Sequence, residues 1–365
     1  MRRISKPISL FTILLLASLI FAFVQIDNCK GLPEEILAVA SASPANSGNS
    51  FSVIWITDTQ YLSESYPLYY DSLCRWIINN REKYNVQMVI HTGDLVEDEW
   101  NTTQWEQANY SISMLQSAGI PYCWDAGNHD FNSTFWIGNQ YSAFNPALMA
   151  EKPYWIGDEF SGQNTAIHVN IAGWDLVVVN LSYHANESAI DWANQVLDSY
   201  QTSHAIVATH AYLNEKGTYT GRGSDESHEA WAENFRNELL DKHSNVFMTL
   251  SAHFYPATGS RVRVGDREDL MFNLQDAHGK LGGASLRILT FDPENSKISV
   301  KTYVVCANQF LQDQNNQFDV ETSFQNTAVP EFPVETVLIA MGVCTVVLFC
   351  LRRNLKAISL KNNKN

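Results

Sequence analysis

The sequence predicts an α/β protein with a mainly parallel sheet, and three observations lead to this expectation. Apolar runs of strand length alternate along the chain with segments whose apolar residues recur at helical spacing. Several of the apolar runs end in polar residues that are able to bind a metal. The chain has 365 residues, 45% of them hydrophobic, which is enough to bury a sizeable core. An alternating β-α-β order favours parallel strands joined by right-handed crossovers.

The first half of the chain supplies three of the expected strands. The third strand begins after a Gly-Ile-Pro break and ends in Asp125-Ala126-Gly127. The expected elements, in order, are strand 51–57, helix 66–83, strand 86–91, helix 103–118 and strand 119–124. A loop-rich insert over 131–163 follows them.

The second half continues the alternation and then changes character. Its expected elements are strands 166–171 and 174–180, helix 187–200, strand 205–209, helix 226–242 and strand 246–250. Short alternating runs separated by turn residues then predict antiparallel strands. These are 259–264, 270–274, 284–291 and 298–305.

Five of the expected strands end in residues that can bind a metal. The residues at these ends are Asp58 and Gln60, then Asp94, then Asn128, His129 and Asp130, then His210, and finally His253. Each alone is explained equally well as a turn residue or a helix cap. Because the carboxyl ends of parallel strands meet at one edge of a sheet, all five together predict a shared metal site.

These motifs together resemble those of the calcineurin-like metallophosphoesterase superfamily, of the secreted or membrane-anchored type with an Asp-x-Gln first motif. The resemblance rests on Asp58-x-Gln60, Gly93-Asp94, Gly127-Asn128-His129-Asp130, His210 and Ala252-His253-Phe254-Tyr255. It implies a four-layer αββα sandwich over residues 50–306, with two packed sheets between helices and a dinuclear metal centre at one rim.

The resemblance also implies a role for each residue. Asp94 bridges two metals, and it shares the second metal with Asn128, His210 and His253. Asp58, Gln60 and Tyr255 stand at the positions of the first metal. His129 contacts the substrate phosphate and protonates the leaving oxygen, and Asp130 orients the His129 imidazole.

Two departures from the family pattern fall on the first metal. Gln60 and Tyr255 stand where the family usually has histidines, so this site is expected to be weak or empty. An alternative hypothesis is therefore a degenerate, non-hydrolytic surface module that binds one metal.

The expected cofactors are two divalent ions, and mixed nitrogen and oxygen ligands suit Mn, Fe, Zn or Mg. The expected reaction is attack of a metal-bound hydroxide on the phosphorus of a phosphomonoester or phosphodiester. The expected partner is thus a small phosphoester substrate. The formal net charge is −15, which argues against nucleic acid as a partner.

The two chain ends predict attachment to a membrane at the cell surface. Basic residues precede an apolar run within residues 1–28, which resembles a signal peptide or signal anchor, and a linker over 29–49 follows. After a polar stalk over 307–333, the run 334–351 is long enough to span a bilayer, and a basic tail over 352–365 follows it. The positive-inside rule then places the catalytic domain outside the cytoplasm.

Two further features agree with an extracytoplasmic domain. The stretch Pro330-Glu331-Phe332 before the apolar run resembles a sorting signal, so a processing enzyme is a further expected partner; the alternative is an ordinary stalk. Outside the two apolar runs lie Cys29, Cys74, Cys123 and Cys306, an even number that allows two disulfides.

Overall fold

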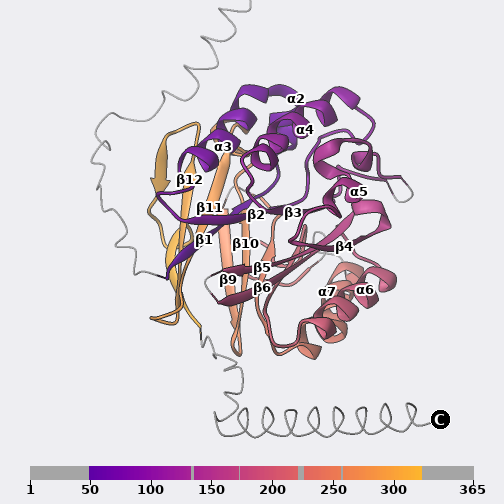
Figure 1. Ribbon diagram of the computed structural model, residues 1–365, viewed down its shortest axis with the longest axis vertical. Helices are drawn as coiled ribbons and strands as arrows, with labels where there is room; N and C mark the ends of the chain where they lie inside the picture. The colour runs from indigo at the N-terminus through magenta and orange to yellow at the C-terminus, as the bar shows by residue number, and fades with distance from the viewer. Residues whose placement is uncertain (1–48, 133–134, 172, 221–225, 256–257, 323–365) are drawn as a thin grey trace, which may run out of the picture. The chain divides into compact units, whose positions relative to one another are not determined.

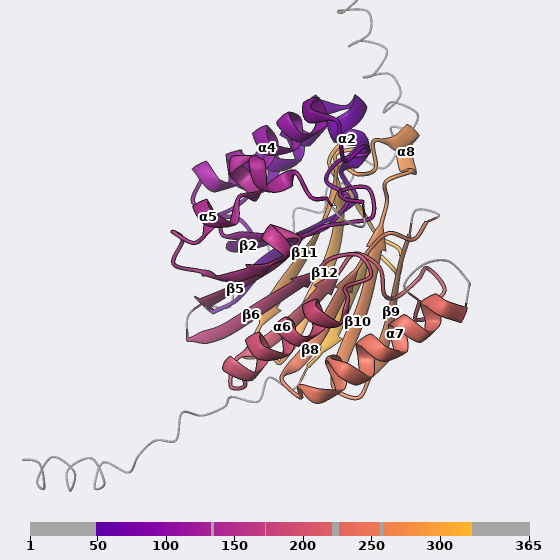
Figure 2. The ribbon, with the colours of Figure 1, turned by 90° about the vertical axis from the view of Figure 1, so that its right-hand side faces the viewer.

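A computed structural model describes residues 49–132, 135–171, 173–220, 226–255 and 258–322 of the chain. Within these residues, two seven-stranded sheets pack face to face, and helices cover the outer face of each (Figure 1). Turned by 90°, the view shows the same order of layers, with α2 and α4 on one side and α6 and α7 on the other (Figure 2). The α/β class and the two-sheet architecture expected from the sequence are confirmed.

The first sheet combines the three N-terminal strands with the last four. Its strands follow the order β13-β12-β11-β1-β2-β3, and β14 pairs with β12 beside β13. They are β1 (Phe51–Ile56), β2 (Val86–Thr92), β3 (Tyr122–Asp125), β11 (Ser285–Asp292), β12 (Lys297–Val304), β13 (Gln309–Leu311) and β14 (Gln317–Glu321). The strands β1, β2 and β3 are parallel, and β11 to β14 are joined antiparallel.

The second sheet follows the order β4-β5-β6-β7-β8-β10-β9. Its strands are β4 (Trp155–Glu159), β5 (Asn164–Ile171), β6 (Trp174–Leu181), β7 (His204–Thr209), β8 (Val246–Ser251), β9 (Thr258–Val264) and β10 (Arg267–Asn273). The strands β6, β7, β8 and β10 are parallel to one another.

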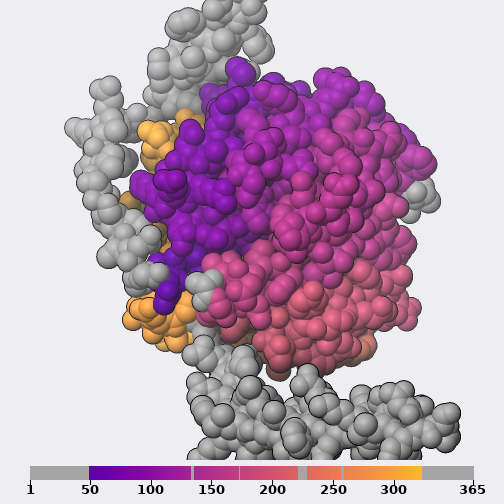
Figure 3. Space-filling view, in the orientation of Figure 1, coloured from indigo at the N-terminus to yellow at the C-terminus, as the bar shows by residue number. Residues whose placement is uncertain are grey.

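The helices form the two outer layers and fill the insert. On the first sheet lie α2 (Gln60–Ser65), α3 (Pro67–Asn79) and α4 (Thr102–Ser117); on the second lie α6 (Glu187–Ser199) and α7 (Glu226–Glu238). The short α5 (Pro146–Met149) belongs to the insert, and α8 (Ala277–Lys280) follows β10. In the space-filling view, the surface passes from the indigo helices of one layer to the salmon helices of the other (Figure 3).

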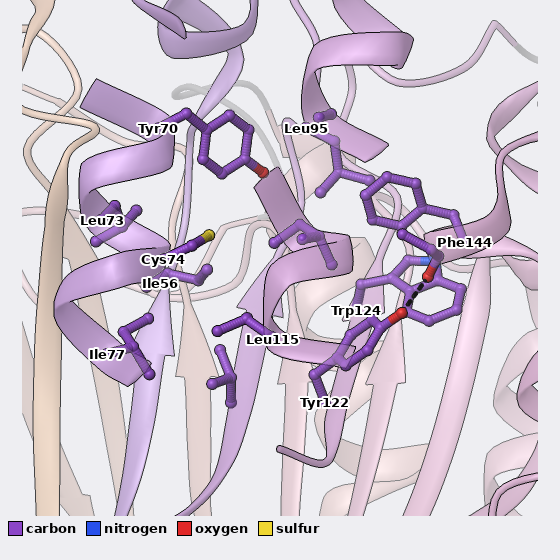
Figure 4. Close-up of a cluster of buried hydrophobic side chains, with 14 of the residues drawn as sticks. Ile56, Tyr70, Leu73, Cys74, Ile77, Leu95, Leu115, Tyr122, Trp124 and Phe144 are labelled. Carbon is purple, nitrogen blue, oxygen red and sulfur yellow. Dashed lines mark hydrogen bonds between the residues drawn. The ribbon is translucent and has the colours of Figure 1, made fainter. Parts of the chain in front are cut away.

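Each helical layer is held to its sheet by a buried apolar cluster. In Figure 4, Leu73 and Ile77 of α3 and Leu115 of α4 lie over the strands of the first sheet. Trp124 and Phe144 extend this cluster to the insert, and the Tyr122 hydroxyl donates to the Ala143 carbonyl at 2.6 Å, which fixes the insert to the start of β3. A second cluster joins α6 and α7 to β6, β7 and β8.

Aromatic contacts join the two sheets to each other. Phe51 of β1 lies edge-on to Trp174 of β6, with ring centroids 5.9 Å apart, and Trp55 of β1 lies edge-on to Phe272 of β10 at 5.5 Å. Since these contacts fix the position of one sheet against the other, side chains from the strand ends of both can form one site.

Two expectations about the C-terminal third are wrong. The strand expected at 270–274 is β10, and it runs parallel to β8 rather than antiparallel to every neighbour. The domain also extends beyond residue 306, because β13 and β14 pair with β12 and bury Val320. The polar composition of 307–321 follows from its place at a sheet edge, where only one face is covered.

The number of cysteines allows two disulfides, but the described residues do not form them. Cys74 and Cys123 are free thiols, buried in different elements. Cys29 lies outside the described residues.

The predicted signal or anchor over 1–28, the linker up to residue 48, and the predicted sorting signal, membrane span and basic tail also lie outside the described residues. In the described part of the chain, no helix is both long enough and apolar enough to cross a membrane.

Candidate metal centre

The carboxyl ends of the parallel strands of both sheets meet at one edge of the sandwich. Two hydrogen bonds between the sheets mark this edge. His210 Nδ1, after β7, lies 2.8 Å from the carbonyl oxygen of Thr92 at the end of β2. Asn273, the last residue of β10, donates from Nδ2 to Asp58 Oδ1 after β1 at 3.0 Å. The candidate site is therefore shared by the two sheets.

Three atoms of other candidate ligands surround His210 Nε2. Asp94 Oδ2 lies 3.3 Å from it, Asn128 Oδ1 lies 3.1 Å from it, and His253 Nδ1 lies 3.2 Å from it. The ligand atoms of Asp94, His210 and His253 all lie within 4.8 Å of one another. The structure thus brings together the four residues that the resemblance assigns to the second metal.

The hydrogen bond at the other ring nitrogen of His210 directs this arrangement. A carbonyl oxygen only accepts, so the Nδ1 that faces Thr92 carries the hydrogen. The Nε2 lone pair of the neutral ring then points at the oxygens of Asp94 and Asn128, which are acceptors as well. Lone pairs that converge in this way fit a divalent cation. A hydrogen bond from the other ring nitrogen to a carbonyl oxygen is typical of metal-binding histidines.

A second group of oxygens lies next to this one, around Gln60. The Gln60 side chain is 1% exposed; its Nε2 lies 3.2 Å from Asp94 Oδ2 and in very close contact with Gln275 Oε1. Gln60 Oε1 is buried and has no hydrogen-bond partner among the described residues. Asp94 Oδ2 therefore contacts both groups, which is the position a bridging ligand requires.

Two loops at this edge require glycine, and three of the candidate site residues adopt a strained backbone conformation. A Cβ on Gly127 would lie 2.2 Å from Asp94 Oδ1, and Gly93 has a φ of +77°. Asp58, Asp94 and His253 all adopt positive φ as well, at 48°, 53° and 68°. Non-glycine residues in this region cost free energy, and such residues cluster at functional sites.

The electrostatics of the site couple a buried carboxylate to a buried imidazole. Burial disfavours charge on both, but His210 lowers the pKa of Asp94 to about 2, and Asp94 raises the pKa of His210 to about 10. Burial and then repulsion from His210 lower the pKa of His253 to about 3. Burial raises the pKa of Asp58 to about 7. A positive charge at His210 Nε2 is thus strongly favoured, whether a proton or a cation supplies it.

His129 lies at the rim of the site and is held by Glu97. Its side chain is 37% exposed, and Nδ1 lies 3.0 Å from the Glu97 carbonyl oxygen and 3.6 Å from a Glu97 carboxylate oxygen. Its backbone N–H donates to Asp94 Oδ1 at 3.0 Å. Burial opposes charge on the ring, but Asp94 and Glu97 raise the pKa of His129 overall.

The expectation that Asp130 orients the His129 ring is wrong. Both carboxylate oxygens of Asp130 accept from backbone amides: Oδ1 from Leu95 at 2.7 Å and Val96 at 3.0 Å, and Oδ2 from Gly127 at 2.7 Å. The carboxylate is fully buried behind the loop, where it fixes the turns that carry Asp94 and His129.

Tyr255 does not join the candidate site in the described structure. Its side chain is 59% exposed, and no described residue forms a hydrogen bond with its hydroxyl. Three residues that do contact candidate site residues were not expected: Glu97, Asn273 and Gln275. Asn273 ends β10 and Gln275 follows it, and the parallel direction of β10 places this end at the site edge. The available signal was a polar Asn-x-Gln after the apolar run 270–272.

The fold and the clustered nitrogen and oxygen donors at the strand ends are those expected of a phosphoesterase-type metal centre. The chain matches the family model of the calcineurin-like phosphoesterases over residues 51–255. It therefore belongs to the calcineurin-like phosphoesterase family, and the resemblance inferred from the motifs is confirmed. Members of this family typically hold two divalent metal ions, and the donors described above fit such ions.

Individual relatives give less information. The chain is 30% identical over 284 residues to the uncharacterized protein YvnB of Bacillus subtilis (strain 168); the match covers 74% of this chain and 21% of that protein. The chain thus spans about a fifth of the length of that relative.

Two solved structures are similar at low identity. Purple acid phosphatase PPD1 from yellow lupin (Lupinus luteus) seeds has a TM-score of 0.46 at 13% identity, over 75% of this chain and 54% of that one. GAP50, the anchor in the inner membrane complex of Plasmodium, has a TM-score of 0.45 at 10% identity, over 75% and 90%. The family assignment depends on the family model and not on these structures.

Proposed function

We propose that this chain hydrolyses phosphomonoesters or phosphodiesters outside the cell by means of two divalent cations bound at the strand ends. Family membership supports the reaction class. The single observation that carries the proposal is the convergence of Asp94, Asn128 and His253 on His210 Nε2, beside a buried Gln60 amide whose Nε2 contacts Asp94 Oδ2 and whose Oε1 has no partner among the described residues. Cations bound there polarise phosphoryl oxygens and lower the pKa of a coordinated water.

The chain's own residues then have separate tasks. Asp94 holds both cations, because its Oδ2 contacts both donor groups. His210, His253 and Asn128 hold the second cation, and Asp58 and Gln60 hold the first.

His129 supplies the proton. Its Nδ1–H is directed at the Glu97 carbonyl, so its Nε2 is left for the leaving oxygen of the substrate. The raised pKa keeps more of this ring protonated near neutral pH, as a general acid requires.

One observation favours a second candidate function, a surface module that binds a single metal and does not turn over. Tyr255 is exposed, and Gln60 replaces a histidine, so the first site has fewer strong ligands than the family pattern. Calorimetric titration of the metal-stripped protein separates the two candidates. Two cations per chain with turnover of a generic phosphoester support the hydrolase; a single cation with no turnover supports the module.

Substitution of the bridging residue tests the proposed function. Asp94→Asn should abolish turnover of generic phosphomonoesters and phosphodiesters, because the bridge loses its charge and much of its affinity for both cations. Asp266→Asn is a matched control, since its side chain is 92% exposed in the turn between β9 and β10, at the opposite end of β10 from Asn273. If the Asp94→Asn protein hydrolyses these esters as well as wild type, the metal-centre assignment is wrong.

The location outside the cell is supported by the sequence of the chain ends, where basic residues flank two apolar runs. Protease added to intact cells should release a soluble fragment that contains Asp94 and His253. Mass spectrometry of the membrane-bound form should show whether the chain continues past Phe332, which tests a processing enzyme at Pro330–Phe332. Full protection of the fragment from protease would contradict the location.

A further inference from the structure

The two halves of the candidate metal centre differ in their donor atoms. Around His210 the donors are two imidazole nitrogens and two side-chain oxygens. Around Gln60 the potential donors are oxygens, from Asp94, Gln60 and Gln275, and Asn273 links Gln275 to a further oxygen donor, Asp58. Within the part of the chain that the structure describes, no imidazole nitrogen forms a hydrogen bond with Asp58, Gln60 or Gln275.

The Gln60 amide is the sign that this second half also receives a cation. Its Nε2 faces Asp94 Oδ2 and Gln275 Oε1, while its buried Oε1 faces no donor. A buried amide oxygen without a donor costs free energy. Exchanging the amide nitrogen and oxygen by a flip does not satisfy the group with protein donors, because three oxygens would then face one another. A cation bound among them satisfies the oxygens in that arrangement.

The buried carboxylates at this position also favour a bound cation. Asp58 and Asp94 are 1% and 2% exposed; burial raises the pKa of Asp58, His210 lowers it, and repulsion from Asp94 raises it further. No lysine or arginine among the described residues forms an ion pair with either carboxylate. Asp58 is held instead by neutral donors, Thr57 Oγ1 at 2.7 Å and Asn273 Nδ2 at 3.0 Å. The two buried carboxylates thus share the charge of one imidazole, His210, and a divalent cation supplies further positive charge where buried carboxylates need it.

Gln275 is held in place to serve such a site. It is 5% exposed, and its backbone N–H donates to Asn273 Oδ1 at 2.8 Å. Asn273 in turn donates to Asp58, so one residue of β10 positions both Asp58 and Gln275. The end of β10 thus supplies an oxygen ligand to a site that Tyr255, 59% exposed, does not join.

We propose that Gln275 completes the first cation site, and that this all-oxygen site selects a hard cation such as Mg²⁺ or Ca²⁺ while the site of His210 and His253 takes Zn²⁺. This proposal rests on the proposed function and adds to it a new ligand and a division of metals between the two sites. Hard cations prefer carboxylate and carbonyl oxygens, and imidazole suits Zn²⁺. The loss of the family histidines then changes the metal that is bound and not the number of sites.

Calorimetric titration tests the proposal without any measurement of turnover. The metal-stripped full chain should bind one Zn²⁺ tightly. The Zn²⁺-loaded chain should then bind one Mg²⁺ or one Ca²⁺, detected by calorimetry and by elemental analysis after desalting. Gln275→Ala should weaken the second event roughly 10- to 100-fold and leave the Zn²⁺ event unchanged. Gln314→Ala, an exposed glutamine on the loop before β14, is the matched control and should change neither event.

Two further variants keep the test informative if Gln275→Ala fails to fold. Gln275→Glu adds a charge at the same length, so it should tighten Mg²⁺ or Ca²⁺ binding. Gln275→His should convert the chain to one that binds two Zn²⁺. Two Zn²⁺ in the wild-type chain, or Mg²⁺ and Ca²⁺ binding unaffected by every Gln275 variant, overturns this proposal and leaves the hydrolase standing. A chain that binds no divalent cation at all overturns the proposed function itself.

Discussion

The carboxylate of Asp130 accepts hydrogen bonds from the backbone amides of Leu95, Val96 and Gly127. These amides belong to the two loops that carry Asp94 and His129. Because the carboxyl group offers acceptors at both oxygens, it can hold both loops at once. The contribution of this residue is therefore to the geometry of the site, and Glu97, rather than Asp130, contacts the His129 ring.

Replacing Asp130 should separate stability from proton transfer. Asp130→Asn retains one acceptor oxygen and places an NH₂ group against a backbone N–H, so it should lower the free energy of unfolding by about 1–3 kcal/mol. The dependence of kcat on pH should keep its wild-type shape, because the His129 ring keeps its contact with Glu97. Urea unfolding and a pH–rate profile check the two parts. A changed profile with unchanged stability would restore the role expected from the sequence.

The reverse pattern is expected at His129. Its side chain is 37% exposed and holds no backbone group other than the Glu97 carbonyl, so His129→Ala should change stability little. Loss of a general acid should reduce kcat by roughly 10²- to 10⁴-fold while the metal content stays as in wild type. A substrate with a good leaving group, such as a nitrophenyl ester, should lose less activity than an alkyl ester. Equal losses for both would show that His129 does not protonate the leaving oxygen.

At the scale of elements, the local hydrophobic pattern correctly predicted the strands and helices in the part of the chain where the two alternate. The strands β1, β2, β7 and β8 and the helices between them fall close to their expected ranges, since burial on both faces gives continuous apolar runs. The polar ends of these strands, such as Asp94 and His210, were therefore placed together correctly at one edge. That they bind a metal remains a prediction.

The direction of β10 and the edge strands were missed for a physical reason. A five-residue apolar run does not show whether it pairs parallel or antiparallel, because that depends on partners distant in sequence. The connection from β8 to β10 passes through β9, and the pairing of β10 with β8 brings Asn273 and Gln275 to the site. The strands β13 and β14 are short, polar and on an edge, so periodicity gives them little signal.

A truncation tests whether these edge strands belong to the domain. Arg287 of β11 is fully buried, donates to the carbonyl of Asn315 before β14 at 2.7 Å, and lies 5.7 Å from the ring centroid of Phe318. A chain that ends at residue 306 leaves this guanidinium with fewer partners and uncovers β12. It should unfold at a lower urea concentration than a chain that ends at residue 322, because its free energy of unfolding is lower by several kcal/mol. Equal stability of the two chains would place β13 and β14 outside the folded unit.

At the scale of the whole molecule, four buried aspartates lie together at the site. Asp58, Asp94, Asp125 and Asp130 are all nearly or fully buried around His210. Burial raises the pKa of Asp125 well above its usual value and that of Asp130 to about 8. Folding thus brings several carboxyl groups to one edge. The protonation of His210 or the binding of cations determines how much their burial lowers the free energy of unfolding.

The stability of the metal-stripped protein should therefore fall as pH rises from 7 to 9. The pKa of His210 is raised to about 10 by Asp94, although burial opposes this, so the stability it contributes is complete below 6.5 and is lost as pH approaches 10. Asp130, with a pKa raised to about 8 by burial, adds a loss of the same sign. His253, lowered to about 3, and Asp94, lowered to about 2, do not titrate in this window.

The slope of stability against pH, compared with and without Zn²⁺ and in a His210 variant, makes this prediction specific to the site. Urea unfolding in the presence of a chelator at pH 7, 8 and 9 should show a loss on the order of 1 kcal/mol per pH unit. Zn²⁺ should flatten the dependence, because a cation at His210 Nε2 replaces the proton and stays bound over this range. His210→Gln should reduce the slope in the chelator, since the main titrating group is gone. A metal-stripped wild type that is equally stable at pH 7 and pH 9 would mean that Asp94 and His210 do not share a buried charge.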